Sequence, residues 1–164
     1  MSDSAVIRRA APGESKFLSD LAFRSKAVWG YSLEFMESCR GELTIERDQI
    51  AAHEAFHLVS ELNGVVVGFY VLRQNSSTDF DLHALFVDPT QIGNGHGRHL
   101  MTHALQNVSK QGGSTLRIQS DPNATKFYEA AGAYQIGLLE SESIPGRQLP
   151  LLQIDVQVTG TDAP

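Results

Sequence analysis

Residues 85–98 constrain the fold of this chain more than any other stretch, because a strand pattern changes there into a helix pattern across alternating glycines. Residues 85–87 are apolar and favour a strand, and Asp88-Pro89 predicts where that strand ends. Glycine then occupies every second position from 93 to 97, and an amphipathic helix follows. The pattern predicts a strand, a tight turn and a helix in direct succession.

The glycine run predicts a phosphate-binding turn. Backbone N–H groups without side chains around them can point into one concavity at a helix N-terminus, where the helix dipole favours an anion. A connection that binds no ligand is the alternative, since glycine-rich turns are common. Two other phosphate-binding patterns are excluded. A dinucleotide fingerprint requires glycine at position 98, where the chain has Arg98, and no G-K-[ST] triplet follows the glycines as a P-loop requires.

Length and composition predict one soluble globular domain over residues 1–164, with short flexible tails at about 1–4 and 159–164. The chain has 164 residues, of which 41% are hydrophobic and 20% charged. Its net charge of −6 argues against nucleic acid or an anionic membrane as the main partner. The polar N-terminus does not resemble a signal peptide and no apolar run approaches ~18 residues, so the cytoplasm is the expected compartment.

The spacing of apolar residues predicts an α/β fold, a mixed sheet with helices on both sides. Strands are expected at residues 5–10, 55–62, 65–72, 80–87, 115–118, 133–139 and 148–158. Helices are expected at about 14–27, 32–40 and 124–131 and from the glycine run to about 110, and a short helix near 46–51. The main elements follow the order β-α-α-β-β-β-α-β-α-β-β, about seven strands flanked by about four helices.

Local signals support these boundaries. Asn63-Gly64 is a strong signal for a two-residue hairpin between the second and third strands. Ser32, with Glu34 close behind, predicts a cap at the start of the second helix. The first helix carries apolar residues at helical spacing, which are Phe17, Leu18, Leu21 and Ala22.

This order and two motifs together resemble the GNAT superfamily of acyl-CoA-dependent N-acetyltransferases. Residues 85–98 resemble its pyrophosphate-binding motif, V-x-x-x-x-[RQ]-x-x-G-x-[GA]. Residues 121–133, which read DPNATKFYEAAGA, resemble its motif N-x-x-[AS]-x-x-F-Y-x-x-x-G-F. Ile92 departs from the first motif, where arginine or glutamine is usual, and Ala133 replaces the last phenylalanine of the second. The change at Ile92 is expected to weaken cofactor affinity unless another contact replaces it, but the backbone cradle is kept.

The resemblance implies transfer of an acetyl group from acetyl-CoA to a primary amine of a small molecule, an amino acid or a peptide or protein, by direct attack in a ternary complex. The residues that it implies for cofactor binding are Leu85, Phe86, Val87, Ile92, Gly93, Asn94, Gly95, His96, Gly97, Arg98 and Asn123. The N–H groups of residues 93–97 would hold the pyrophosphate. The backbone of Leu85 and Val87 would pair with the pantetheine arm like an added strand, in a slot that a bulge opens in this family.

Two residues of the second motif receive roles from the resemblance. Tyr128 matches the general acid, which would protonate the departing thiolate of coenzyme A. The alternative is a half-buried Tyr128 that only packs and finds some hydrogen-bond partner. Asn123 reaches the cofactor arm in the family, and it is also a suitable cap for the short helix that follows.

A base for the ammonium substrate is less clearly indicated. Asp81 and His83 share one face of the predicted strand with Leu85 and Val87, and members of the family often place a carboxylate or water relay there. His83 titrates near neutrality, as a base should, but a histidine on a strand is often an ordinary core or surface residue.

The acceptor pocket is expected near the break between the first two helices. Trp29 and Tyr31 lie in that break and are tentative acceptor residues, with a structural anchor as the alternative for Trp29. Arg24 and Lys26 close by could hold a carboxylate of the acceptor, although charged residues on an exposed helix usually face water.

No metal is expected. His99 and His103 have the spacing of a two-histidine site and share a helix face with His96, but no carboxylate or cysteine accompanies them. The single cysteine, Cys39, excludes an internal disulfide and is expected to be inert.

Two other functions are weighed against an acetyltransferase. One is a non-catalytic module that binds CoA or acyl-CoA for regulation, against which Tyr128 argues because a sensor needs no thiol acid. The other is a nucleotide-binding module, which the missing fingerprints disfavour. The expected partners are therefore acetyl-CoA and an amine acceptor, and a homodimer stays open because dimers are common in the family.

Overall fold

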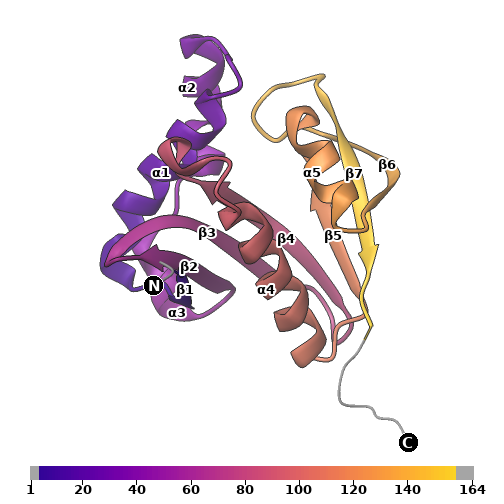
Figure 1. The fold of residues 1–164 in the computed structure, drawn as a ribbon. Coiled ribbons are helices and arrows are strands. Elements are labelled where there is room, and N and C mark those ends of the chain that lie inside the picture. Colours follow the sequence, from indigo (N-terminus) through magenta and orange to yellow (C-terminus); the bar gives the residue numbers. More distant parts are fainter. Residues whose placement is uncertain (1–3, 158–164) are drawn as a thin grey trace, which may run out of the picture. The chain divides into compact units, whose positions relative to one another are not determined.

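The computed structural model describes residues 4–157 of the chain (Figure 1). Its strands are β1 Val6–Arg9, β2 Phe56–Leu62, β3 Val65–Gln74, β4 Asp79–Val87, β5 Thr115–Gln119, β6 Tyr134–Glu140 and β7 Gln148–Asp155. Its α-helices are α1 Ser15–Ala27, α2 Leu33–Leu43, α3 Arg47–Ala52, α4 His96–Lys110 and α5 Thr125–Ala130. Short 3₁₀ turns at Pro12–Glu14, Pro89–Gln91 and Pro122–Ala124 precede α1, the glycine run and α5.

The predicted fold class is confirmed. The strands form one seven-stranded sheet in the order β1-β2-β3-β4-β5-β7-β6. The short helix expected near residues 46–51 is formed as α3, which follows α2 in the element order, and β3 runs two residues beyond its predicted end. The predicted end of the last strand, at 158, lies outside the described residues, as do positions 1–3 and 159–164 of the predicted tails.

The chain divides into two compact units. The first comprises the chain up to Val71 together with Ala84–Leu100, and the second comprises Leu72–His83 together with the chain from Met101 onward. The long strands β3 and β4 and the helix α4 thus each contribute residues to both units. The predicted glycine loop lies in the first unit, and the segment that resembles the second motif lies in the second.

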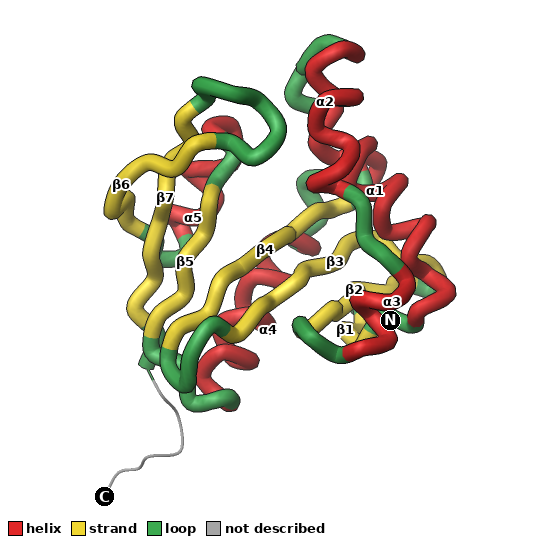
Figure 2. Tube along the Cα trace, turned by 180° about the vertical axis from the view of Figure 1, so that it is seen from behind, coloured by secondary structure: helices red, strands yellow, loops and turns green. Residues whose placement is uncertain are grey.

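The core of the first unit is built around β3. Residues 66–71 of this strand are all buried, which is the pattern of a strand covered on both faces. Leu18, Leu21 and Ala22 form the buried face of α1, whereas Phe17, which shares their helical spacing, is 43% exposed. Figure 2 shows β1, β2 and β3 side by side in this unit.

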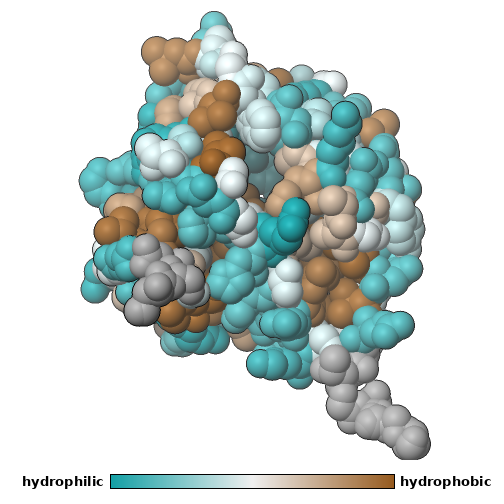
Figure 3. All heavy atoms as spheres, viewed as in Figure 1, coloured by the Kyte–Doolittle hydropathy of each residue, from teal (hydrophilic) through white to brown (hydrophobic). Residues whose placement is uncertain are grey.

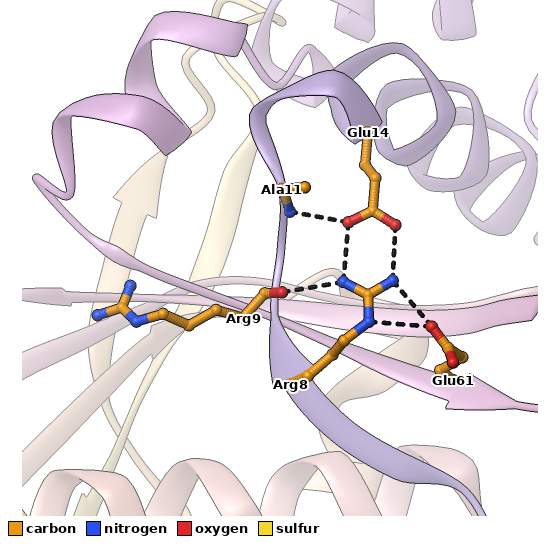
Figure 4. A network of polar contacts seen from close by, with 5 residues as sticks. All are labelled: Arg8, Arg9, Ala11, Glu14 and Glu61. Carbon is orange, nitrogen blue, oxygen red and sulfur yellow. Dashed lines mark hydrogen bonds and ion pairs between the residues drawn. The ribbon is translucent and has the colours of Figure 1, made fainter. Parts of the chain in front are cut away.

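A network of ion pairs centred on Arg8 joins β1 to its neighbours in the first unit (Figure 4). Arg8 donates two hydrogen bonds to the carboxylate of Glu14, at 2.8 and 3.0 Å, and its Nε donates to Glu61 of β2 at 2.9 Å. Glu14 also accepts from the backbone N–H of Ala11 at 2.8 Å. The guanidinium therefore fixes the turn before α1 against the β1–β2 pair.

The second unit contains the antiparallel end of the sheet. β5 pairs with β7, and β7 pairs with β6, with an irregularity between Gln135 and Gly137. Leu116 and Ile118 of β5 and Leu152 of β7 are buried and belong to the core of this unit. β5 also pairs in parallel with β4, and this ladder covers three residue pairs, from Asp79↔Thr115 to Asp81↔Arg117.

The predicted turn and cap signals are confirmed. Asn63 and Gly64 have φ of 52° and 81°, the left-handed conformation that a two-residue hairpin turn of type I′ requires at both positions. Ser32 caps α2, because its side chain accepts a hydrogen bond from the N–H of Phe35 at 3.1 Å. Asn63-Gly64 thus connects β2 to β3, and Ser32 begins α2, through conformations and hydrogen bonds that are local in sequence.

Apolar side chains are also exposed. On the β6 strand of the second unit they are Tyr134, Ile136, Leu138 and Leu139. Figure 3 shows brown apolar groups among hydrophilic residues on one face of the molecule. None of the helices within residues 4–157 combines the length and apolar character that a membrane span requires.

Candidate active site

The glycine loop, residues 92–98, begins where β4 ends. The backbone N–H of Asp88 still donates to the carbonyl of Val67 in β3 at 2.8 Å, and Pro89 then starts a 3₁₀ turn. The Asp88 carboxylate caps this turn by accepting from the N–H of Thr90 at 2.9 Å and from its hydroxyl at 2.7 Å. The predicted end of the strand is thus confirmed, whereas the 3₁₀ turn before the glycines was not predicted.

Two glycines of the loop have backbone conformations that other residues rarely adopt. Gly93 has φ of +90° and Gly95 has φ of +84°, and both are in the left-handed region. No atom lies within 4 Å of the place where a Cβ would stand on either residue, so open space surrounds both positions. A ligand can therefore approach the backbone closely here.

The loop ends in the first turn of α4. The N–H of His99 donates to the carbonyl of Gly95 at 3.0 Å, so Gly95 is the residue that begins the helix. The N–H groups of Gly95, His96, Gly97 and Arg98 donate to no other backbone group within the described residues. A fifteen-residue helix with uncommitted donors at its positive end is a suitable site for a phosphate group.

The side chains around this turn differ in exposure. Ile92 is 58% exposed, whereas His96 is buried, and Arg98 is exposed. Asn94 is tied to the 3₁₀ turn, since its side-chain nitrogen donates to the side-chain oxygen of Gln91 at 3.1 Å. Arg98 lies in the first turn, where its positive charge can supplement the anion site.

The β4 strand that leads into the loop is only partly paired on its β5 side. The ladder with β5 ends at Asp81, and His83 lies two residues further on, with an exposed side chain. In the first unit, Leu85 and Val87 are half-buried, and the ring of Phe86 tilts against that of Phe69 at 5.8 Å between centroids. The backbone of β4 beyond Asp81 therefore has no β5 partner in the described ladder.

Tyr128 lies in α5 of the second unit. Its side chain is only 7% exposed, and its ring meets that of Phe127 edge to face at 5.2 Å. Burial, with a smaller contribution from the charge of Asp121, raises the pKa of Tyr128 well above its usual value. Its hydroxyl makes no hydrogen bond with any residue that the structure describes. The hydroxyl proton is therefore not donated to a protein acceptor.

Asn123 does not cap α5, and this prediction was wrong. Asp121 begins the 3₁₀ turn instead, and its carboxylate accepts from the N–H of Asn123 at 2.8 Å and from its side-chain nitrogen at 3.0 Å. The residue that directly precedes α5, Ala124, makes no side-chain cap. Both short helices lie within the second motif, and the cap belongs to Asp121, at the start of the 3₁₀ turn, and not to Asn123, which lies just before α5.

The segment between α1 and α2, residues 28–32, is called the connecting segment. Gly30, with φ of +86°, breaks the helices as predicted, and Trp29 is 48% exposed. Tyr31 stacks on Phe35 at 4.2 Å between ring centroids, and the Lys26 ammonium lies over the Tyr31 ring at 5.3 Å. Trp29 is therefore the more accessible of the two predicted acceptor residues.

Arg24 has a partner that the sequence did not reveal. Its Nη1 lies 3.2 Å from the Asp88 carboxylate. Burial raises the pKa of the Asp88 carboxyl, but the hydrogen bonds from Thr90 and Arg24 outweigh it and hold this pKa below its usual range. The sequence predicted Asp88 only as the end of a strand. Its second role, as the cap of the 3₁₀ turn, could have been found from the run Asp-Pro-Thr, which is typical of a capped turn.

Metal-binding clusters of three or more histidine, cysteine, aspartate or glutamate side chains are absent from residues 4–157. His96 is buried, whereas His99 is exposed, so these two do not present a common surface. Cys39 is a buried thiol in α2.

The comparisons with known proteins agree with this description. The family model described as "Acetyltransferase (GNAT) domain" matches residues 34–138. No curated protein sequence matches the chain.

Solved structures share the fold at low sequence identity. A GCN5-related N-acetyltransferase from Rhodopseudomonas palustris is 20% identical with a TM-score of 0.77, over 95% of this chain and 99% of that one. The ribosomal-protein-S18-alanine N-acetyltransferase from Escherichia coli is 16% identical with a TM-score of 0.71, over 98% and 99%. The PaiA N-acetyltransferase from Thermoplasma acidophilum, solved with coenzyme A, is 17% identical with a TM-score of 0.69, over 94% and 99%.

A family model that covers most of the chain, together with a shared fold, defines its class. The chain belongs to the GNAT family of acetyltransferases.

Proposed function

We propose that this protein transfers an acetyl group from acetyl-CoA to a primary amine by direct attack in a ternary complex. The observation that carries the proposal is the start of α4, where uncommitted N–H groups follow two glycines in the left-handed conformation. Such a turn suits the pyrophosphate of acetyl-CoA, because it offers several donors and the positive end of a helix dipole together. Structural neighbours that contain coenzyme A support this choice of donor.

The backbone of β4 holds the pantetheine arm in this proposal. Amide groups of the arm pair with the backbone of Leu85 and Val87 as an added strand would. The short ladder between β4 and β5 supports this role, because pairing ends at Asp81 and leaves the later residues of β4 without a β5 partner. Asn123 is exposed and lies next to α5, which suits a further contact with the arm.

The proposed acetyl transfer needs a proton donor for the thiolate and a proton acceptor for the ammonium group. The amine nitrogen forms a bond to the acetyl carbonyl carbon, the carbon–sulfur bond breaks, and the thiolate takes a proton from the hydroxyl of Tyr128. The attacking nitrogen loses one further proton as it becomes an amide, and this proton restores the Tyr128 hydroxyl through solvent. The position of Tyr128 in the second motif supports this assignment, and burial, which raises its pKa, keeps the hydroxyl protonated throughout the neutral range. His83 or Asp81, or a water held by them, takes the proton that the ammonium group must lose.

The acceptor binds against the connecting segment. Trp29 offers an exposed aromatic surface there, and Tyr31 lies in the same segment. Arg24 is engaged by Asp88, and the Lys26 ammonium lies over the Tyr31 ring, so neither is assigned to a carboxylate of the acceptor. The acceptor class proposed is a primary amine of a small molecule, an amino acid, or a peptide or protein.

The test is release of free thiol from acetyl-CoA in the presence of a panel of amines. The account predicts amine-dependent thiol release by the wild-type protein, and mass spectrometry of the product should show one added acetyl group. Tight binding of acetyl-CoA without release for any amine would instead favour the non-catalytic CoA-binding module.

A further inference from the structure

The ion pair between Arg24 and Asp88 joins the two parts of the first unit that bind the two substrates in the proposed function. Asp88 precedes the glycine loop, and Arg24 lies in the last turns of α1, just before the connecting segment. We propose that Asp88 and Arg24 are positioning residues that couple acetyl-CoA binding at the glycine loop to the order of the connecting segment. This inference rests on the proposed function.

Both oxygens of the Asp88 carboxylate are used. Oδ1 accepts from the N–H and the hydroxyl of Thr90, and Oδ2 accepts from Nη1 of Arg24 at 3.2 Å. The side chain of Asp88 is 18% exposed, so water competes weakly for it. Its direction is therefore set by Thr90 on one side and by Arg24 on the other.

A chain of hydrogen bonds leads from Asp88 into the glycine loop. The carbonyl of Asp88 accepts from the N–H of Gln91 at 2.8 Å, and the carbonyl of Gln91 accepts from the N–H of Asn94 at 3.4 Å. The side chains of Gln91 and Asn94 form a second link at 3.1 Å. Since Asn94 lies between the two left-handed glycines, a shift of Asp88 moves the backbone that carries the uncommitted N–H groups.

A similar chain leads from Arg24 into the connecting segment. The turns after Arg24 are continued by hydrogen bonds from Trp29 to the carbonyl of Lys26, at 3.2 Å, and from Gly30 to that of Ala27, at 3.1 Å. Trp29 and Tyr31 follow directly. Arg24 is thus joined to the connecting segment by the backbone turns that follow it. Its guanidinium joins it to Asp88, which precedes the glycine loop.

An ordinary surface ion pair is the competing explanation. The side chain of Arg24 is 46% exposed, and exposed pairs contribute little to global stability. The buried residues Leu18, Leu21 and Ala22 already anchor α1. Loss of the pair should therefore leave the fold intact, and the two explanations differ only in what happens to ligand binding. Coupling between two sites is reciprocal, so it can be measured from either side.

The experiment compares the wild-type protein with Arg24→Gln, Arg24→Lys and Asp88→Asn. Asp88→Asn keeps an oxygen for the N–H of Thr90 but removes the charge that Arg24 meets. Arg40→Gln is the control, because Arg40 of α2 forms an ion pair with Glu37 at 2.7 Å and is similarly exposed, at 52%. The Arg40 guanidinium also lies 4.1 Å from the centroid of the Phe23 ring in α1, so this variant removes a contact with α1 but leaves the Arg24–Asp88 pair in place. Acetyl-CoA affinity is measured by calorimetry, and hydrogen exchange is followed in residues 28–32 and 92–98.

In the wild-type protein, acetyl-CoA is expected to slow exchange in both segments. In Arg24→Gln and Asp88→Asn it should slow exchange only in the glycine loop, with acetyl-CoA Kd raised about fivefold. Arg24→Lys should partly restore both effects, and Arg40→Gln should behave as the wild type.

Each other outcome overturns a distinct claim. If the wild-type protein binds acetyl-CoA but exchange in the connecting segment does not change, or changes equally in Arg24→Gln, the coupling is wrong and the proposed function stands. If the wild-type protein does not bind acetyl-CoA, both fail.

Discussion

Tyr128 is the residue whose environment bears most directly on the proposed chemistry. It is buried, its pKa is raised, and its hydroxyl has no acceptor among the described residues. A protonated hydroxyl without a protein acceptor can donate its proton to a bound ligand, as a general acid must.

Replacement of Tyr128 by phenylalanine tests this role. We expect Tyr128→Phe to lower kcat by about 10² to 10⁴-fold, the usual contribution of general acid catalysis, with little change in acetyl-CoA Kd. Because the pKa of Tyr128 is raised, its ionisation should not cause any fall in kcat between pH 7 and 9. Steady-state kinetics and calorimetry on the same preparations measure both effects; full turnover in the variant would assign Tyr128 to packing alone.

His83 is exposed on β4, and its proposed role as base or relay has its own signature. If it takes the proton, kcat/KM should rise with pH through its titration, and His83→Ala should flatten that acid limb while acetyl-CoA Kd is kept. The acceptor ammonium also loses a proton with rising pH, so wild type and variant must be compared on one amine, over pH ~5.5 to 9. Profiles of identical shape would exclude His83 as the titrating group.

Residue roles were the hardest part to predict from the sequence. Asn123 was a reasonable cap by type, but Asp121 lies two residues earlier and captures its N–H and side chain. The partner of Arg24 lies 64 residues away in sequence, and no local pattern reports a contact of that separation.

At the scale of elements, the turn before α1 depends on the pairing of Arg8 with Glu14 (Figure 4). The hydrogen bond from Arg8, together with smaller contributions from Ala11 and the Arg8 charge, outweighs burial and holds the pKa of Glu14 below its usual value. A carboxyl whose pKa is lowered on folding stabilises the protein above its unfolded-state pKa, about 4.3, and loses this contribution as pH falls through its folded pKa.

We therefore expect Glu14→Gln to lower the free energy of unfolding by about 1 kcal/mol at pH 7. The difference from wild type should shrink as the pH falls from about 4.3, the unfolded-state pKa, through the lower folded pKa at which Glu14 is protonated. Urea unfolding at several pH values measures this, with Glu54→Gln as the control, since Glu54 is exposed. A difference that is constant from pH 7 to 3 would contradict the account.

Elements themselves were largely predictable, because their signals are local. The Asn63-Gly64 turn, the Ser32 cap and the break at Gly30 all lie where the sequence predicts them. The 3₁₀ turn at Pro89–Gln91 was missed, since its single cap at Asp88 resembles the end of a strand in sequence. Periodicity also does not tell which members of an apolar stripe are covered: Phe17 has the helical spacing of Leu18 and Leu21 but is 43% exposed.

At the scale of the whole molecule, the sequence predicted the family because two motifs lie in the right order along one sheet topology. The mixed sheet and the place of the glycine loop after β4 are confirmed. The acceptor could not be predicted, because Trp29 and Tyr31, the proposed acceptor residues, belong to neither motif. The central claim is that the glycine loop holds acetyl-CoA.

Ligand-dependent stability tests that claim most directly. Acetyl-CoA at about one hundred times its Kd should raise the free energy of unfolding of the wild-type protein by about 2.7 kcal/mol, and NAD or ATP should raise it less. Gly95→Asp should abolish the gain, because it places a carboxylate where the phosphates bind. Gly95→Asn is the matched control, since asparagine also tolerates the φ of +84° but carries no charge, and it should keep part of the gain. Equal stabilisation by acetyl-CoA and NAD, or an undiminished gain in Gly95→Asp, would contradict the account.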